Sequence, residues 1–144
     1  MKPTTEVKIR GYHLDVYGHV NNARYLEFLE EARWDLFENH FGLERWKAKQ
    51  LGFFVVRIAI NYRRPASLGD VLSIATHISH FGKKSAVFTQ RIFRKADEEL
   101  IADADITVDL APTSDTGIPA DNVTTLVQPA FMGRAEAGAQ IRLF

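Results

Sequence analysis

The fold is decided by the stretch Asp15-Val-Tyr-Gly-His-Val-Asn-Asn-Ala-Arg-Tyr25, which runs directly into Leu26-Glu-Phe-Leu-Glu-Glu-Ala-Arg-Trp-Asp-Leu-Phe37. Its apolar residues recur close to the i, i+3, i+4, i+7 spacing of an amphipathic helix. They are Tyr25, Leu26, Phe28, Leu29, Ala32, Leu36 and Phe37. At about 100° per residue they cover roughly half of the helix circumference. The sequence therefore predicts a helix that lies on a large apolar surface and leaves its other face free.

The lead-in to this helix carries residues that can do chemistry. Asn21 or Asn22 can cap the helix, so Asp15 and Gly18 lie just ahead of its positive end. A carboxylate there can act as a base or a nucleophile, and the free N–H groups of the helix end can stabilise an oxyanion. Gly18 lets a substrate approach the backbone closely. On spacing alone, Asp15 can equally be a turn residue, since aspartate favours loops.

The chain around this helix, up to residue 110, predicts mainly strands. Residues 6–14 begin with the alternation of a strand, with Gly11 as a bulge, and residues 43–51 fit a short second helix that ends before Gly52. From residue 53 the period changes to two, and the predicted strands are 53–63, 71–80, 85–95 and 99–110. Their short connections predict an antiparallel sheet, for which the long helix is the large apolar partner. We therefore expect an α+β fold in which the sheet curls around the helix.

The composition limits the classes of function. The 144 residues suit one domain, 1–144, whose last part, 119–144, lacks periodicity and is expected to be an irregular tail. Eighteen basic residues balance eighteen acidic ones, which argues against a nucleic-acid partner. The absence of cysteine excludes disulfides and a thiol nucleophile and fits a reducing compartment. With no secretory signal and no membrane-spanning apolar run, we expect a cytoplasmic protein without membrane insertion.

The histidines do not form an obvious catalytic or metal-binding set. His19 can serve as a general base near neutral pH, but no serine or cysteine nucleophile is near it. A structural or substrate-contact role for His19 is therefore the favoured interpretation. His13 and His19 lack helical metal-ligand spacing, and His77 and His80 point to opposite faces of a strand, so no metal site is expected.

Two pairs of basic residues, Arg63-Arg64 and Lys83-Lys84, flank two ends of the predicted sheet. Either pair can bind a phosphate, and either can be a solvated end of a strand. Without further support, the solvated strand end is the favoured interpretation. The glycine-rich phosphate-binding motifs, the nucleophile elbow of hydrolases and the HExxH zinc motif are all absent.

The run Asp15–Tyr25 resembles the Asp-x-x-Gly-x-Val motif of the hotdog-fold acyl-CoA thioesterases of the 4-hydroxybenzoyl-CoA thioesterase family. The longer run Arg10–Trp34 resembles, more narrowly, the bacterial long-chain acyl-CoA thioesterase III branch of that family. Ile60-Asn-Tyr-Arg-Arg-Pro-Ala66 and Gly82-Lys-Lys-Ser85 also match the family pattern. The likeness covers about residues 5–110 and fades after Pro119.

This resemblance implies a hotdog fold, a homodimer or homotetramer with its active site at the dimer interface, and an acyl-CoA substrate. It implies that Asp15 is the catalytic carboxylate, that Asn22 offers its backbone N–H to the thioester carbonyl, and that Gly18 and His19 belong to the catalytic motif. Arg63, Arg64, Lys83, Lys84 and Ser85 become candidates to bind the CoA moiety. Candidates to line an acyl slot are Phe28, Leu29, Ala32, Trp34 and Phe54. The expected function is hydrolysis of medium- or long-chain fatty acyl-CoA to free acid and CoA, without a cofactor.

Two other functions stay open on the sequence. One is a hotdog enoyl-CoA hydratase, but such enzymes resemble a pattern with an Asn-Pro that is absent here. The other is a non-catalytic acyl-CoA-binding sensor, which can keep the fold and lose the carboxylate. The presence of Asp15 argues against the sensor.

Overall fold

The computed structural model describes residues 3–42, 44, 48 and 51–112. Residues Met1–Ala111 form one compact unit. The expected extent of the domain to residue 144 and the expected irregular tail over residues 119–144 lie outside the described residues. Of the short helix predicted over residues 43–51, Glu44 and Ala48 are described as helical.

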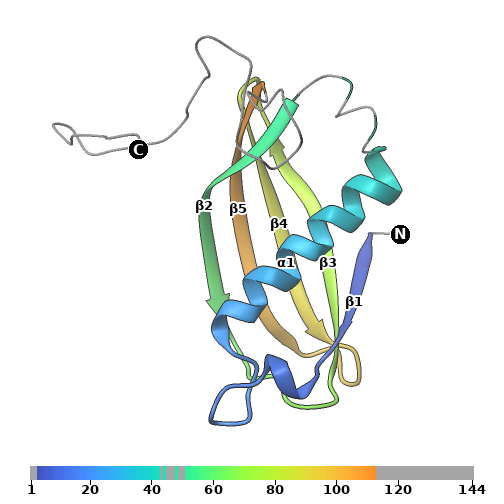
Figure 1. The fold of residues 1–144 in the computed structure, drawn as a ribbon, viewed down its shortest axis with the longest axis vertical. Helices are drawn as coiled ribbons and strands as arrows, with labels where there is room; N and C mark the ends of the chain where they lie inside the picture. The colour runs from blue at the N-terminus through green and yellow to red at the C-terminus, as the bar shows by residue number, and fades with distance from the viewer. Residues whose placement is uncertain (1–2, 43, 45–47, 49–50, 113–144) are drawn as a thin grey trace, which may run out of the picture. The chain divides into compact units, whose positions relative to one another are not determined.

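Five strands form one sheet in this unit (Figure 1). They are β1 (Thr4–Lys8), β2 (Leu51–Tyr62), β3 (Val71–Phe81), β4 (Ser85–Arg94) and β5 (Leu100–Pro112). Their order is β1-β3-β4-β5-β2, so β1 and β2 are the two edges. Strands β1 and β3, β3 and β4, and β4 and β5 pair antiparallel, and Figure 1 shows β2 running opposite to β5. The predicted antiparallel sheet is confirmed.

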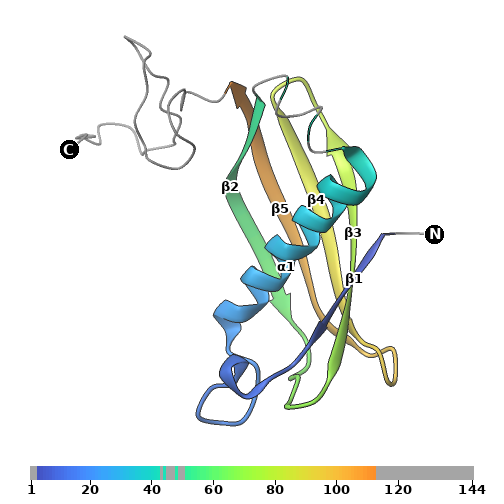
Figure 2. The ribbon, with the colours of Figure 1, turned by 45° about the vertical axis from the view of Figure 1, so that its right-hand side comes forward.

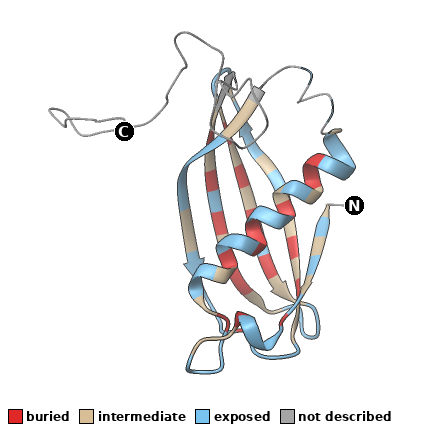
Figure 3. Cartoon of the chain, in the orientation of Figure 1, coloured by how far each residue is buried: buried red, intermediate tan, exposed pale blue. Residues whose placement is uncertain are grey.

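Helix α1 (Asn22–Leu36) lies across one face of this sheet (Figures 1 and 2). Its buried residues are Tyr25, Phe28, Leu29, Ala32 and Leu36. They confirm the predicted apolar stripe, whereas Leu26 at its margin is 37% exposed. Figure 3 shows the buried residues gathered on α1 and the central strands, where Ile74, Phe88 and Ile106 are fully covered. Burial of each such side chain contributes about 1.5–3 kcal/mol, so packing of the helix on the sheet stabilises the fold.

The helix is followed by one wide turn, η2 (Phe37–Phe41), with π-helical geometry, and the chain leaves it at Gly42. Gly42 has a φ of 73°, a left-handed conformation that glycine adopts without a Cβ clash. The ring of Phe37 packs against Phe53 and Phe88 at centroid distances of 4.8 and 5.8 Å. The predicted end of the helical region at Phe41-Gly42 is therefore confirmed.

Three sequence predictions differ from the structure. Gly11 is not a strand bulge, because β1 ends at Lys8 and Gly11 opens a short 3-10 helix, η1 (Gly11–His13). Gly52 does not follow a helix, since it lies inside β2. Ile101 alternates with Leu100 and Ala102 in the predicted strand 99–110, which places it with Asp103 and Asp105 on the solvated face, but Ile101 is fully buried. It is an extra residue in the ladder, because β4 pairs Ile92 with Ala102 but Phe93 with Leu100.

Strand β2 is an edge strand with an apolar surface. Phe54, Val55, Val56 and Ile58 are 38–46% exposed. The backbone N–H and C=O groups of an edge strand form a template on which another chain can pair, and exposed apolar side chains favour such pairing.

Candidate active site

The Asp15 loop is a tight reversal between Leu14 and Val20, which pair with each other. Gly18 turns the chain with a φ of 74°, and its N–H donates to the Asp15 carbonyl oxygen at 3.1 Å. Oδ1 of the Asp15 carboxylate accepts the N–H groups of Tyr17 at 2.8 Å and His19 at 3.3 Å. These bonds fix the orientation of the carboxylate. Its Oδ2 has no partner within the described part of the chain and is available to a substrate or a water.

The start of α1 leaves one N–H group free beside this loop. Asn21 is the N-cap residue, and its Oδ1 accepts the N–H of Ala23 at 2.9 Å. The Asn21 carbonyl oxygen accepts the N–H of Arg24 at 2.9 Å. Asn22 is the first helical residue, so its N–H has no acceptor inside the helix, and none is found among residues 3–42, 44, 48 and 51–112. Of the two asparagines, Asn21 therefore caps the helix and Asn22 offers the donor.

One open cavity of about 340 Å³ brings these groups together with the end of β2. Its lining residues are Asp15, His19, Val20, Asn22, Tyr25, Tyr62, Arg63, Arg64 and Pro65. Five of the sequence candidates, Asp15, His19, Asn22, Arg63 and Arg64, thus share one cavity. Gly18 contributes the turn of the loop rather than the wall.

Tyr62 lines the cavity, although the sequence favours an ordinary strand residue at this position and indicates no role for it in the site. Its hydroxyl donates to the Asn22 carbonyl oxygen at 3.0 Å, and its ring lies 5.5 Å from that of Tyr25. Tyr62 therefore ties the last residue of β2 to the first residue of α1. Tyr62 and Asn22 lie 40 residues apart in the chain, so no local pattern signals this contact.

Arg63 and Arg64 are held at the cavity by the bulge in β5. The Ile101 carbonyl oxygen accepts both backbone N–H groups, at 2.8 Å from Arg63 and 3.2 Å from Arg64. The Arg63 guanidinium donates to Asp103, and this hydrogen bond is the main cause that lowers the pKa of that carboxyl. The Arg64 Nε donates to Glu99 Oε1 at 3.1 Å. Both guanidinium groups are exposed and paired with carboxylates at the rim.

The second basic pair lies at the other end of the sheet. Lys83 and Lys84 are exposed in the turn between β3 and β4, and Ser85 begins β4. Val71, at the start of β3, lies near the cavity end, and the turn follows Phe81 at its far end. At about 3.3 Å per residue, the length of β3 separates this turn from the cavity by roughly 30 Å. Within one copy of the chain, these three candidates do not reach Asp15.

The predicted acyl-slot residues do not line the cavity either. Phe28, Leu29 and Ala32 are buried in the core, while Trp34 and Phe54 are 48% and 44% exposed. The described residues hold no group of three or more histidine or acidic side chains that suits a metal ion. Among them, no helix has the length and apolar character needed to cross a membrane.

Comparison with known proteins decides the family to which this geometry belongs. Residues 9–111 match the thioesterase-like superfamily. The chain belongs to this superfamily. The long-chain acyl-CoA thioesterase FadM of Escherichia coli K12 is 52% identical over 103 residues, which are 72% of this chain and 78% of FadM.

Two further relatives agree with this assignment. The acyl-CoA thioester hydrolase YbgC of Escherichia coli O6:H1 is 36% identical over 95 residues, 65% of this chain and 70% of YbgC. The crystal structure of the probable thioesterase YbaW from Escherichia coli matches with a TM-score of 0.72 at 50% identity, over 76% of this chain and 82% of that one. The expected hotdog fold is confirmed, and so is the expected class of thioester hydrolase at the level of the superfamily.

Proposed function

We propose that this thioesterase hydrolyses fatty acyl-CoA of medium or long chain to free acid and CoA. One observation carries the proposal: the Asp15 carboxylate lines the same cavity as Asn22, and within the described residues neither its Oδ2 nor the Asn22 N–H has another partner. Hydrolysis of a thioester needs a base or nucleophile and a donor to the developing oxyanion, and a carboxylate beside a helix N–H can supply both. The names of FadM and YbgC supply acyl-CoA as the substrate class.

The chemistry follows from these two groups. The thioester carbonyl oxygen accepts the Asn22 N–H, which stabilises the negative charge that develops on this oxygen. Asp15 Oδ2 either takes a proton from the attacking water or attacks the carbonyl carbon itself, giving an anhydride that water opens. In both routes the carbon–sulfur bond breaks and the CoA thiolate leaves and takes up a proton. His19 contacts the substrate beside Asp15, and Gly18 provides the turn that presents the carboxylate.

Two arginine side chains at the rim of the cavity can bind the CoA moiety. Arg63 and Arg64 are exposed cations on the cavity wall, and guanidinium groups bind phosphate with two parallel hydrogen bonds. Each arginine must exchange part of its contact with Asp103 or Glu99 for the phosphate. We assign these two residues to the nucleotide and phosphates of CoA.

Lys83, Lys84 and Ser85, which are far from the cavity within one copy, can reach it in a dimer. We propose that two copies pair along β2, whose exposed apolar edge invites pairing. In an antiparallel pair of β2 strands, the far end of one sheet lies beside the cavity end of the other. Lys83, Lys84 and Ser85 of a second copy then approach the cavity of the first, and the active site lies at the dimer interface. Further pairing of dimers into a tetramer and a cytoplasmic location stay predictions.

The first prediction is that Asp15→Asn abolishes thiol release from acyl-CoA while the fold is kept. Loss of a general base costs about 10²- to 10⁴-fold in rate, and loss of a nucleophile at least as much. Free thiol is measured with short, long and aromatic acyl-CoAs, and this panel also supplies the preferred chain length. Asp105→Asn, which removes an exposed carboxylate on β5, is the matched control and retains the wild-type rate.

Other outcomes of this experiment point to other functions. Binding of every acyl-CoA without thiol release by the wild type contradicts the enzyme and supports the sensor. An absorbance change with crotonyl-CoA but no free thiol supports the hydratase. Thiol release that survives in Asp15→Asn keeps the activity and overturns the assignment of the carboxylate.

A further inference from the structure

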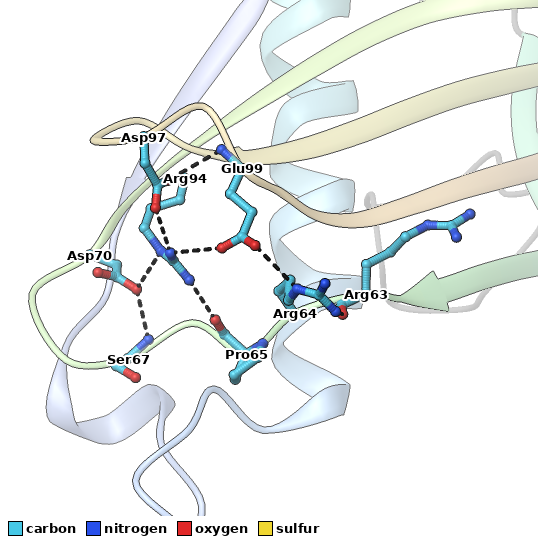
Figure 4. A network of polar contacts seen from close by, with 8 residues as sticks. All are labelled: Arg63, Arg64, Pro65, Ser67, Asp70, Arg94, Asp97 and Glu99. Carbon is cyan, nitrogen blue, oxygen red and sulfur yellow. Dashed lines mark hydrogen bonds and ion pairs between the residues drawn. The ribbon is translucent and has the colours of Figure 1, made fainter.

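Arg94, the last residue of β4, joins several segments from outside the cavity (Figure 4). Its Nη1 donates to Asp97 Oδ2 at 2.8 Å and to Glu99 Oε2 at 3.0 Å. Its Nη2 donates to the Pro65 carbonyl oxygen at 2.9 Å, and its Nε forms an ion pair with Asp70 Oδ2 at 3.3 Å. The side chain is 20% exposed, so solvent screens these contacts less than those of an open surface pair.

The segment Pro65–Asp70, which Arg94 contacts at its first and last residues, supports the Asp15 loop. The Ala66 carbonyl oxygen accepts the N–H of Val20 at 2.9 Å, and Ser67 pairs with His19. Within the segment, Asp70 Oδ2 accepts the N–H of Ser67 at 2.9 Å. The guanidinium thus links the two ends of the segment against which His19 and Val20 lie, in addition to the backbone hydrogen bonds that Ile9 forms with Gly69 and Asp70.

Arg94 also controls the carboxylate that holds Arg64 at the rim. Glu99 Oε2 accepts a hydrogen bond from Arg94, and Glu99 Oε1 accepts one from Arg64, whose side chain is 64% exposed. With Arg94 in place, Glu99 is shared and holds Arg64 through one oxygen. Without Arg94, Glu99, Asp70 and Asp97 lose their common cation, and their negative charge lies next to Arg64 and any phosphate bound there.

We propose that Arg94 is a positioning residue of the thioesterase site. It fixes the segment Pro65–Asp70, and through it the Asp15 loop, and it keeps Arg64 oriented and available at the rim. Arg94 itself lies outside the cavity lining and acts through these neighbours. This inference rests on the proposed function for its effect on turnover, and on the hydrogen bonds alone for its effect on the loop.

The test compares Arg94→Met, Arg94→Lys and the control Lys95→Met. Lys95 is the next residue, and its Nζ pairs with Glu6 on β1 at 2.6 Å, away from the cavity. Two quantities are measured: amide hydrogen exchange over residues 14–24, and kcat and KM for an acyl-CoA that the wild type hydrolyses. In Arg94→Met we expect exchange at least about 10-fold faster over residues 14–24, because opening of the loop becomes easier. We expect kcat about 10- to 100-fold lower, because small displacements of a catalytic group are costly, together with a higher KM.

The conservative variant sharpens the comparison. Lysine keeps the charge but not the planar fork that reaches Pro65, Asp97 and Glu99 together, so Arg94→Lys recovers part of the loss. Lys95→Met retains wild-type exchange and kinetics. If Arg94→Met does not fold, Arg94→Lys against Lys95→Met carries the same test.

Wild-type kcat and KM in Arg94→Met overturn the proposal, whatever happens to its thermal midpoint, because the role is then structural only. Unchanged exchange over residues 14–24 overturns it as well, even when Asp15→Asn is inactive and the proposed function stands. If the wild type hydrolyses no acyl-CoA, the proposed function fails, and the exchange comparison alone decides whether Arg94 holds the Asp15 loop.

Discussion

His13 is a buried histidine that supports the start of α1 from outside the cavity lining. It is 8% exposed, and its ring lies between those of Tyr12 and Phe28, at centroid distances of 4.2 and 5.0 Å. Its Nδ1 accepts the N–H of Arg10 at 3.0 Å, which requires the unprotonated nitrogen, and its carbonyl oxygen accepts the N–H of Asn21 at 2.9 Å. The neutral imidazole therefore stabilises the backbone that holds the N-cap residue Asn21.

We predict that the protein becomes less stable as pH falls, because His13 becomes protonated more readily in the unfolded chain. Burial, and next the Arg24 cation, hold the pKa of His13 below its ordinary value of 6.5. Between the folded-state pKa and 6.5 the unfolded chain binds more protons, so the free energy of unfolding decreases as pH falls through that window. Urea unfolding at about pH 8 and about pH 5 measures the decrease in wild type and in His13→Asn. The decrease is smaller in the variant, and equal decreases contradict the prediction.

The residues of the site divide into those that local sequence predicts and those that it does not. Asp15, His19 and Asn22 lie within eight positions of one another, so a turn and a helix cap suffice to bring them together. Tyr62 and the Ile101 carbonyl reach the same place through the sheet. Their contacts depend on which strands are neighbours and on a bulge, and neither leaves a periodic signal in the chain.

The first turn of α1 depends on Asn21 rather than on its neighbour. We predict that Asn21→Ala lowers the free energy of unfolding by about 1 kcal/mol, because the N–H of Ala23 loses its acceptor. The matched control is Asn22→Ala, which keeps the cap and the backbone N–H and changes stability by less than about 0.5 kcal/mol. Chemical denaturation of both variants checks this. A larger loss in Asn22→Ala contradicts the assignment of the cap.

The helix and the strands can be predicted from the spacing of apolar residues and from the glycines and prolines between them, whereas the irregularities of these elements cannot. The stripe of α1 and the alternation of β3 to β5 reflect burial against one common core, so each face can be predicted from the sequence. Gly11 and Gly52 show the limit of such prediction, because a glycine is compatible with a bulge, a turn, a helix end or a strand. The bulge at Ile101 could not be predicted either, because one inserted residue shifts the alternation only locally.

For the molecule as a whole, the exposed edge at β2 predicts self-association. Val56→Lys places a charge on this edge, where lysine is known to block strand pairing, so we expect a dimeric wild type and a monomeric variant by light scattering. Trp34→Lys changes an exposed apolar residue on helix α1 rather than on the edge strand, and keeps the wild-type mass. The Val56→Lys monomer also loses thioesterase activity if the Lys83–Ser85 turn of a second copy completes the site. A monomeric wild type with full activity contradicts this part of the proposal.

The Ile101 carbonyl has a consequence for how such an enzyme changes its preference. It anchors the main chain of Arg63 and Arg64 without using either side chain. Substitutions at these two positions therefore alter the chemistry of the rim while the backbone that presents it stays in place. In the proposed mechanism, selectivity for the CoA moiety is thus separate from hydrolysis at Asp15 and Asn22. We therefore expect substitutions at Arg63 and Arg64 to change the preferred carrier of the acyl chain without loss of the fold.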